Sequence, residues 1–228
     1  VQEVLSSRPG LRWEIVVADN GSQDRSAEVA SALGARVVSV PVPGYGSALI
    51  GGITAAAGRY VMFADADGTY VYEDALRLYD ATLGEEADMG IASRMTGKIE
   101  PGAMPALHRH LGTPVLTGLI NMLFRGRLTD CNSGFRCLKK ESFESWGVRA
   151  TGMEFASELL INALKNRART VEIASGLRPS PVERQPHLKT WRDGMRHLLF
   201  ILSERPALPE VLGLMMVVVA SLLQGIGA

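Results

Sequence analysis

The stretch Tyr60-Val-Met-Phe-Ala-Asp65-Ala-Asp67-Gly-Thr-Tyr70 decides the fold of this chain. Its first half is a short apolar run bounded by Gly58 and Gly68, which is typical of a strand covered on both faces. In open α/β sheets, ligands gather at the carboxyl ends of such strands. Because side chains alternate along an extended chain, Asp65 and Asp67 point to the same side, where they can bind a divalent cation and a neighbouring group of the same ligand. An acidic turn after a strand is the alternative interpretation.

Short apolar runs and longer amphipathic runs alternate through the first half of the chain. This alternation predicts an α/β fold with a mostly parallel central sheet and helices on both faces. Farther along we expect a helix near Glu154–Asn166, a strand at Thr170–Ala174 and an amphipathic helix at Trp191–Ser203. The elements expected in the first half are strands at Glu14–Ala18, Arg36–Val40, Tyr60–Ala64 and Asp88–Ala92, and helices at about Arg25–Leu33, Ser47–Ala57 and Glu73–Leu83.

A long, weakly polar helical stretch is expected at Leu107–Phe124. Pro114 lies inside this stretch, and we expect it to break the helix there. The apolar character of the stretch suits a helix that lies against a membrane surface or over a pocket.

The composition favours one large domain and gives no indication of a nucleic-acid partner. The chain has 228 residues, of which 46% are hydrophobic, and this is enough to bury a core. Lys plus Arg and Asp plus Glu are 24 each, so the net charge gives no reason to expect a nucleic-acid partner. Cys131 and Cys137 lack metal-ligand spacing and are expected to be reduced thiols.

The C-terminal residues carry no charge from Val211 to Ala228. This apolar run is close to the length needed to begin a membrane span. Basic residues precede it, which by the positive-inside bias places the bulk of the chain on the cytoplasmic side of a membrane. We therefore expect one domain over residues 1–206 and the start of a membrane-anchoring segment over 207–228, with a buried C-terminal helix as the alternative. The basic residues are Arg184, Lys189, Arg192, Arg196 and Arg205.

Two further loops follow expected strands. The run Asp19-Asn-Gly-Ser-Gln-Asp24 ends the first strand, where the base and ribose of a nucleotide usually meet polar side chains, although it also fits a turn that caps the next helix. The run Gly44-Tyr-Gly-Ser47 begins a helix and allows the backbone to approach a ligand closely. A dinucleotide fingerprint is disfavoured because Leu49 takes the place of the third glycine and Pro43 spoils the tight turn.

Four stretches, taken in order, carry a family resemblance. They are Asp19-Asn-Gly-Ser-Gln-Asp24, Gly44-Tyr-Gly-Ser-Ala48, Gly58-Arg-Tyr-Val-Met-Phe-Ala-Asp-Ala-Asp67 and Thr129-Asp-Cys-Asn-Ser-Gly-Phe-Arg136. They resemble the inverting glycosyltransferase family 2, specifically its dolichyl- and polyprenyl-phosphate sugar synthases. The stretches at 97–105, 151–158 and 187–197 narrow the resemblance to a bacterial and archaeal branch of membrane-bound members. The resemblance covers about Trp13 to Pro206.

This resemblance implies a GT-A fold, a Rossmann-like architecture that holds a nucleotide sugar and a divalent metal, Mg²⁺ or Mn²⁺. By motif position, Asp19, Asn20, Gly44 and Asp65 would bind the donor. Asp65 and Asp67 would bind the metal, with Asp67 also serving the diphosphate.

The chain departs from the family pattern at two places. Many relatives carry Gln two positions after the second Asp, where this chain has Thr69, so a third protein ligand is not assigned. The family's first strand, with its Pro-x-x-Asn-Glu motif, would lie ahead of Val1. We therefore expect this chain to be a piece of a longer protein.

The acceptor implied by the resemblance needs no catalytic base, because a prenyl phosphate, with a second pKa of about 6, is already an anion near neutral pH. The site must instead supply positive charge to the departing diphosphate and to the acceptor phosphate. We assign Asp67, Arg94 and Asp130 to catalysis, with Asp130 expected to orient the sugar or hold a donor hydroxyl. The acceptor phosphate is assigned to Arg109, Arg184 and Lys189, with Arg136 as a weaker candidate; a solvated surface charge is the alternative for each cation.

We therefore expect a metal-dependent hexosyltransferase that moves a hexose from a nucleotide sugar, of the UDP-glucose or GDP-mannose type, to a polyprenyl or dolichyl phosphate at the cytoplasmic face of the cell membrane. Two alternatives stay open. One is a family 2 enzyme acting on a saccharide hydroxyl in cell-envelope polysaccharide synthesis, with Asp130 as its base. The other is a non-catalytic subunit that binds a nucleotide sugar or a lipid, because the missing strand and Thr69 would also fit a decayed site.

Overall fold

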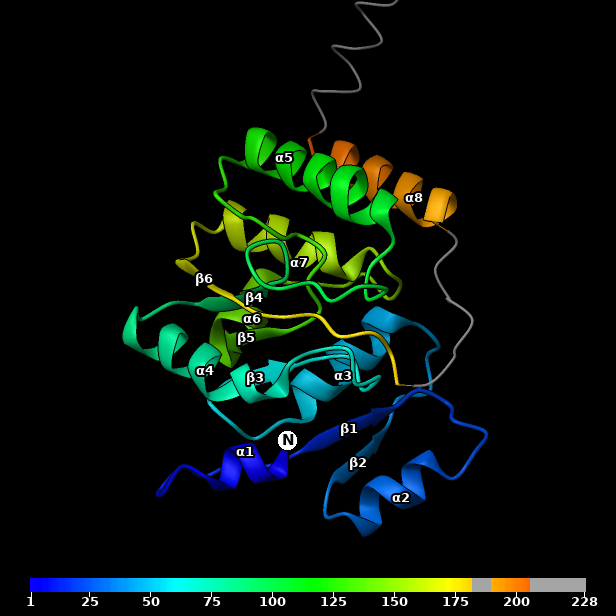
Figure 1. The fold of residues 1–228 in the computed structure, drawn as a ribbon, viewed down its shortest axis with the longest axis vertical. Helices are drawn as coiled ribbons and strands as arrows, with labels where there is room; N and C mark the ends of the chain where they lie inside the picture. The colour runs from blue at the N-terminus through cyan, green and yellow to red at the C-terminus, as the bar shows by residue number, and fades with distance from the viewer. Residues whose placement is uncertain (182–189, 206–228) are drawn as a thin grey trace, which may run out of the picture.

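A two-stranded parallel sheet opens the fold. In the computed structural model, which describes residues 1–181 and 190–205, β1 (Val16–Asp19) pairs with β2 (Arg36–Ser39), and Asp19 lies opposite Ser39. The short helix α1 (Gln2–Ser6) precedes β1, and α2 (Ser26–Ala32) connects the two strands. This unit forms one end of the molecule (Figure 1).

The second sheet has four strands in the order β3-β5-β4-β6. They are β3 (Tyr60–Phe63), β4 (Met89–Ser93), β5 (Arg136–Lys139) and β6 (Thr170–Ala174). β4 and β6 are parallel, but β5 runs antiparallel to both β3 and β4. The prediction of a mostly parallel central sheet is therefore wrong in this respect. The sheet is mixed because β5 returns between two strands that come much earlier in the sequence.

Helices cover both faces of the sheets, as the alternating pattern predicts. α3 (Tyr45–Ala55) follows β2, a 3₁₀ turn (Tyr72–Asp74) leads into α4 (Ala75–Gly84), and α6 (Lys140–Trp146) follows β5. α7 (Phe155–Lys165) lies between the four-stranded sheet and an end layer that contains α5 (Thr113–Phe124) and α8 (Thr190–Ser203) (Figure 1). The expected strands and helices agree with these elements to within two residues, but α1, β5 and α6 were not predicted.

Pro114 does not break its helix. The chain forms a π-helical turn at His108–Gly112 and continues directly into α5, where the proline occupies the first turn. A proline is tolerated there because its fixed φ suits the first turn of an α-helix, where its missing N–H group costs least. The expected helical stretch is thus confirmed, with a change of helical type instead of an interruption.

The core consists of two apolar clusters. The larger one joins the sheet to the inner sides of α5 and α7, and includes Met89, Ile91, Ile120 and Leu160. The smaller one lies against α4 and includes Tyr70, Leu78 and Phe135. The predicted membrane-anchoring segment falls at 207–228, outside the described residues. Among the helices that the structure describes, none combines the length and the apolar character that a bilayer crossing requires.

Candidate active site

The two carboxylates that follow β3 lie in different surroundings. Oδ1 of Asp67 accepts hydrogen bonds from the Thr69 amide at 3.0 Å and from the Thr69 hydroxyl at 2.7 Å. Oδ2 of Asp67 makes no hydrogen bond with the described residues, so it is available to a ligand. The backbone oxygen of Asp65 accepts the Tyr72 hydroxyl at 2.5 Å. Thr69, which raised doubt about a third metal ligand, thus serves to orient the Asp67 carboxylate.

The Asp65 side chain points into a group of hydroxyls around Gly134. A Cβ atom placed on Gly134 would lie 2.8 Å from Asp65 Oδ2, 3.0 Å from the Tyr70 hydroxyl and 3.3 Å from the Tyr45 hydroxyl. The Gly134 amide donates to the Tyr70 oxygen at 2.6 Å. Burial, and then the charge of Asp67, raise the pKa of Asp65, and burial raises the pKa of Tyr70 to about 12. Only glycine fits at this position without moving these groups.

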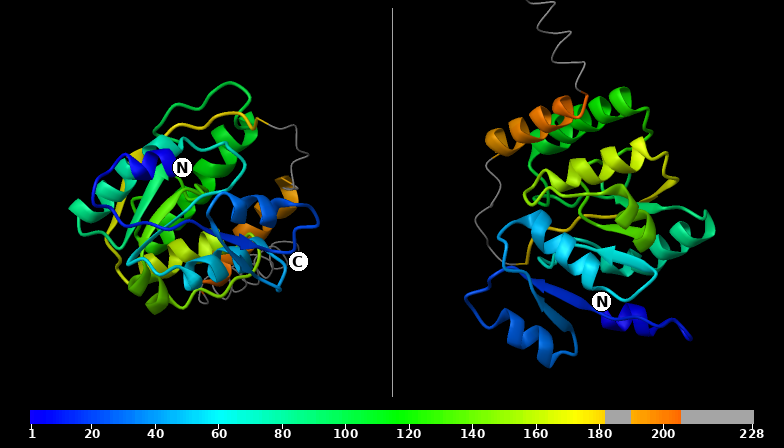
Figure 2. Two further views of the ribbon diagram at one scale, coloured as in Figure 1. Left: turned by 90° about the horizontal axis from the view of Figure 1, so that it is seen from below. Right: turned by 180° about the vertical axis from the view of Figure 1, so that it is seen from behind.

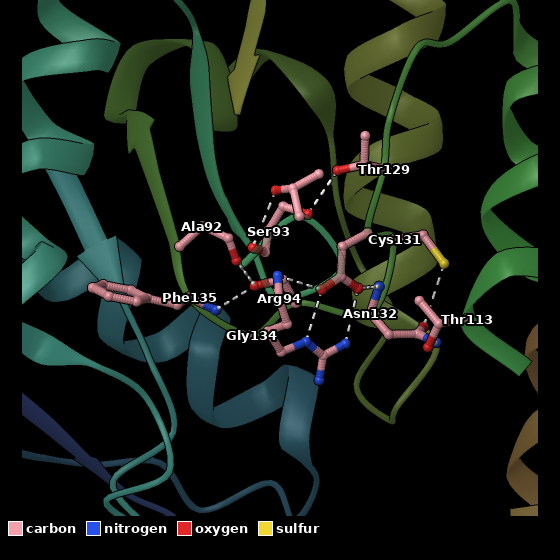
Figure 3. Close-up of polar contacts among 12 residues, drawn as sticks. Ala92, Ser93, Arg94, Thr113, Thr129, Cys131, Asn132, Gly134 and Phe135 are labelled. Atoms are coloured by element: carbon pink, nitrogen blue, oxygen red, sulfur yellow. Dashed lines mark hydrogen bonds and ion pairs between the residues drawn. The ribbon is translucent and has the colours of Figure 1, made fainter. Parts of the chain in front are cut away.

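Arg94 and Asp130 form a buried ion pair with two parallel hydrogen bonds (Figure 3). Arg94 Nε donates to Asp130 Oδ2 at 2.7 Å and Nη2 donates to Oδ1 at 2.8 Å. The backbone amides of Arg94 and Asn132 donate to the same carboxylate at 3.0 and 3.1 Å. Burial alone would raise the pKa of Asp130, but the hydrogen bonds and charge of Arg94 outweigh it and the pKa is lowered.

This arrangement defines what each partner can do. Both oxygens of Asp130 are engaged and its side chain is fully buried, so it holds Arg94 in place instead of facing a substrate. The Arg94 side chain is 12% exposed, and its third nitrogen, Nη1, makes no hydrogen bond with the described residues. A bidentate pair that leaves one guanidinium nitrogen open suits the binding of a phosphate oxygen.

The loops after β1 and β2 are joined by Asn20. Its amide nitrogen donates to the carbonyls of Val40 and Val42 at 2.8 and 2.7 Å, and its oxygen accepts the Gly44 amide at 2.7 Å. Asp19 Oδ1 accepts the Ser22 amide at 3.1 Å, as in a capping turn. Asn20 therefore joins the backbones of these two loops, and Asp19 Oδ2 makes no hydrogen bond with residues 1–181 and 190–205.

Glycines let the start of α3 approach the loop before α7. A Cβ atom on Gly44, whose φ is +139°, would lie 2.2 Å from the Thr151 carbonyl oxygen, and one on Gly46 would lie 2.0 Å from that of Ala150. The Ser47 amide donates to the Thr151 oxygen at 3.1 Å. Gly44 is thus required for close packing of backbone on backbone at this edge of the site.

The cations assigned to the acceptor phosphate have different surroundings. Arg109 is exposed on the π-helical turn, while Arg184 and Lys189 lie outside the described residues. Arg136 is buried inside the protein, where it donates to the carbonyls of Cys131 and Ser133 at 2.8 Å and of Ala156 at 3.2 Å. Arg136 therefore supports the turn that carries Gly134 and does not reach a ligand directly.

The site contains residues that sequence analysis did not single out. Tyr45, Tyr70 and Gly134 all lie beside Asp65 but come from separate segments, so no spacing in the chain announces that they meet. All three residues lie within or beside the sequence motifs described above, but only the folded chain shows that they surround Asp65. Cys131 and Cys137 are buried free thiols, as expected, and burial raises their pKa values to about 11 and about 12.

The protein ligands fit a hard divalent cation of the kind that shares its coordination with a substrate. No cluster of three or more His, Cys, Asp or Glu side chains that could hold a metal occurs within residues 1–181 and 190–205. A fully protein-bound metal is therefore not built from the described part of the chain. Mg²⁺ sites, in contrast, commonly use one or two carboxylates and complete the coordination with phosphate oxygens and water. Asp67, with an open Oδ2, and Asp65 match that type.

Several known proteins with similar sequences are named as glycosyltransferases or hexosyltransferases. The hexosyltransferase Agl6 of low-salt glycan biosynthesis from Haloferax volcanii is 37% identical over 194 residues, which cover 85% of this chain and 46% of that protein. The dolichyl-phosphate hexose transferase of the same organism is 32% identical over 152 residues, covering 66% of this chain and 63% of that protein. The chain thus spans about half to two thirds of the length of these relatives.

The fold is shared with a solved glycosyltransferase. Glucosyl-3-phosphoglycerate synthase from Mycobacterium tuberculosis, in complex with Mn²⁺, UDP and glucosyl-3-phosphoglycerate, matches with a TM-score of 0.66 at 23% identity. The match covers 89% of this chain and 72% of that one. This likeness establishes a GT-A-like α/β fold with mixed sheets. The model of the family described as glycosyl transferase family 2 matches residues 1–147, and this chain therefore belongs to that family.

Proposed function

We propose that this chain is the catalytic part of an inverting, metal-dependent hexosyltransferase that transfers a hexose from a nucleotide sugar to a polyprenyl or dolichyl phosphate. The observation that carries the proposal is that an open carboxylate, Asp67, and an open guanidinium, Arg94, are both close enough to the buried Asp65 for their charges to act on it. The charges of Arg94 and Asp65 both act on Tyr70, so the two halves of the site are close. The half of the site that contains Asp67 suits a cation, and the half that contains Arg94 suits an anion.

The donor half would hold the nucleotide diphosphate through Mg²⁺ or Mn²⁺. Asp67 and Asp65 would be the protein ligands, and the cation would neutralise the charge that develops on the departing diphosphate. The Mn²⁺ and UDP complex of the M. tuberculosis synthase supports a donor of this chemical class. Asp19 lies at the end of β1 with one carboxylate oxygen that no described residue hydrogen-bonds, and this oxygen would meet the base, while Asn20 with Gly44 would hold the shape of that edge.

The acceptor half favours a phosphate over a sugar hydroxyl. Transfer to a hydroxyl needs a general base, and Asp130, the candidate for it, has both oxygens bonded to Arg94. A lipid phosphate needs no base, and Arg94 Nη1 is a suitable donor to it. The name of the Haloferax dolichyl-phosphate hexose transferase supports the same acceptor class. We also propose that residues 207–228 begin a membrane anchor that keeps the site at the cytoplasmic face.

A donor and acceptor panel on the full-length protein tests the proposal. UDP- and GDP-sugars would be offered with a short polyprenyl phosphate, with a saccharide acceptor and with water alone, each with Mn²⁺ or EDTA. We expect transfer to the prenyl phosphate that EDTA abolishes. Transfer only to the saccharide would support the hydroxyl-transferring alternative. Donor binding without transfer or hydrolysis would support a non-catalytic subunit.

Gly134→Ala is expected to weaken Mn²⁺ binding about tenfold, because groups that orient a metal ligand typically contribute 10–100-fold to affinity. The new methyl group would displace the Asp65 carboxylate or the Tyr70 hydroxyl. Gly118→Ala is the matched control, since a Cβ atom there meets nothing within 4 Å. Calorimetric titration with Mn²⁺ and UDP measures the effect. Equal Mn²⁺ affinities of the two variants would show that Asp65 is not a metal ligand.

Truncation of Arg184 or Lys189 to Ala is expected to raise the KM for prenyl phosphate or lower kcat, with little change in donor affinity. The reason is their place in the sequence, between the last strand and the helix that leads into the apolar tail, where a lipid phosphate would arrive. Arg25→Ala is the control, because the Arg25 side chain is 84% exposed and pairs with Glu28 at the surface. Acceptor kinetics, measured together with donor binding by calorimetry, decide the outcome. Loss of donor affinity alone would indicate that Arg184 and Lys189 bind the diphosphate of the donor.

A further inference from the structure

Tyr45, the first residue of α3, directs its side chain toward the Asp65 carboxylate. Its hydroxyl lies 3.3 Å from the point where a Cβ atom on Gly134 would stand, and Asp65 Oδ2 lies 2.8 Å from the same point. The hydroxyl and the carboxylate are hydrogen-bond partners, and this hydrogen bond opposes the burial that raises the pKa of Asp65. A hydroxyl group from another element thus meets the carboxylate that follows β3.

Aromatic packing fixes the ring of Tyr45. The ring meets Phe155 edge to face, with the centroids 6.4 Å apart, and Phe155 meets Phe63 in the same manner at 6.1 Å. Phe63 ends β3, two residues before Asp65, so one aromatic side chain at the start of α7 braces both Tyr45 and the strand that leads to Asp65. These contacts involve the rings, so removal of the Tyr45 hydroxyl alone should leave the packing intact.

The other two tyrosines near Asp65 hold the backbone. The Tyr70 oxygen accepts a hydrogen bond from the Gly134 amide at 2.6 Å. The Tyr72 hydroxyl donates to the backbone oxygen of Asp65 at 2.5 Å. Among these tyrosines of the described chain, Tyr45 is therefore the one whose hydroxyl hydrogen-bonds the Asp65 carboxylate itself.

Tyr45 is also attached to the loop after β1. The amide of Gly44, the preceding residue, donates to the side-chain oxygen of Asn20 at 2.7 Å. Figures 1 and 2 show α3 between the β1–β2 unit and α7. The Asp65 carboxylate is thereby linked, through one side chain, to the backbone of the loops at which the nucleotide is proposed to bind.

We propose that Tyr45 is a positioning residue whose hydroxyl orients the Asp65 carboxylate toward the divalent cation, as the Thr69 hydroxyl orients Asp67. Tyr45 acts through Asp65 and is not itself a metal ligand. Hydrogen-bond partners of metal ligands typically contribute about 10–100-fold to metal affinity. The inference rests on the proposed function, in which Asp65 is a metal ligand.

The test is the Mn²⁺ affinity of Tyr45→Phe in the full-length protein, because this variant loses the hydroxyl and keeps the ring. Calorimetry and the electron paramagnetic resonance signal of free Mn²⁺, both with UDP present, should show about tenfold weaker binding. The affinity for UDP in EDTA and the melting temperature should not change. Tyr79→Phe is the matched control, because the Tyr79 ring also packs edge to face, on Tyr60, but lies beside Arg8.

A double-variant cycle shows whether Tyr45 acts through Asp65. Asp65→Asn should weaken Mn²⁺ binding by itself. Tyr45→Phe combined with Asp65→Asn should bind Mn²⁺ about as weakly as Asp65→Asn alone, because the hydroxyl then has no metal ligand left to orient.

Other results overturn the proposal. Normal Mn²⁺ affinity of Tyr45→Phe would make the hydroxyl a structural group only and would leave the proposed function intact. An equal loss in Tyr79→Phe, additive losses in the double variant, or a loss of UDP affinity in EDTA would mean that the hydroxyl does not act on the metal through Asp65. If the wild type binds no Mn²⁺ with UDP, or if Asp65→Asn binds Mn²⁺ normally, the metal assignment in the proposed function fails, and the role of Tyr45 fails with it.

Discussion

Asp67→Asn should lower metal-dependent turnover by about 10²–10³-fold, the usual effect of removing one electrostatic contact to charge that develops in a transition state. The substitution keeps the shape of the side chain, and an amide oxygen can still accept the two hydrogen bonds from Thr69. What it removes is the negative charge beside the open Oδ2 position. The fold should therefore be retained while the affinity for Mn²⁺ falls.

The measurement compares initial rates across Mn²⁺ concentrations with thermal unfolding of the same proteins. Asp80→Asn is the control, because Asp80 is a carboxylate within α4 that pairs with Arg8 at the surface, away from β3. A normal melting temperature with lost turnover supports the metal assignment. Near-normal turnover of Asp67→Asn would show that the carboxylate is only part of an acidic turn.

Much of the fold follows from local patterns in the sequence. The strands β1, β2, β3, β4 and β6 each contain Val, Ile or an aromatic residue, the residue types that favour strands, so local patterns locate them. β5 was not predicted, because only two apolar residues, Cys137 and Leu138, lie between Arg136 and Lys139. A buried arginine does not fit the sequence pattern of a strand. The strand exists because carbonyl groups of the turn and of α7 satisfy the guanidinium.

The candidate site was predictable where its chemistry lies within one motif. Asp65 and Asp67 sit at the end of a strand, as their sequence indicates. The partnership of Arg94 with Asp130 was not predicted, although both residues were chosen, because it joins segments 36 positions apart. Such a contact depends on the antiparallel return of β5. The same holds for Gly134, whose lack of a side chain matters only because Asp65 and Tyr70 crowd it.

Asn20 shows how a residue assigned to a ligand can have another role in the structure. The residue follows β1, where the sequence predicts donor binding, but its side-chain amide is bonded to Val40, Val42 and Gly44. A motif match locates such a residue at a site, while only the hydrogen bonds distinguish a ligand contact from a support for the loop. Thr69 is a second example, because its hydroxyl donates a hydrogen bond to Asp67 and so supports that carboxylate.

Arg94→Met should be among the most destabilising single changes in this site, by about 3–5 kcal/mol at neutral pH, because it leaves a buried carboxylate without its cation. The pH dependence gives the sign of the effect. In the wild type the pKa of Asp130 is lowered, so the ion pair contributes stability above the unfolded-state pKa and loses it only as pH falls below about 4. In Arg94→Met, burial without the cation raises that pKa, so the variant should become more stable on acidification from pH 7 to pH 5.

The double variant Arg94→Met with Asp130→Asn separates support from chemistry. It removes both charges, so it should recover most of the stability that Arg94→Met loses and should show no such gain on acidification. Turnover should stay low, because no guanidinium nitrogen then remains for the proposed acceptor phosphate. Urea unfolding at pH 5 and pH 7, beside acceptor kinetics at saturating donor, measures both properties. Recovery of stability together with turnover would mean that Arg94 serves only to neutralise Asp130. The proposed acceptor phosphate would then have to be bound by other cations such as Arg109.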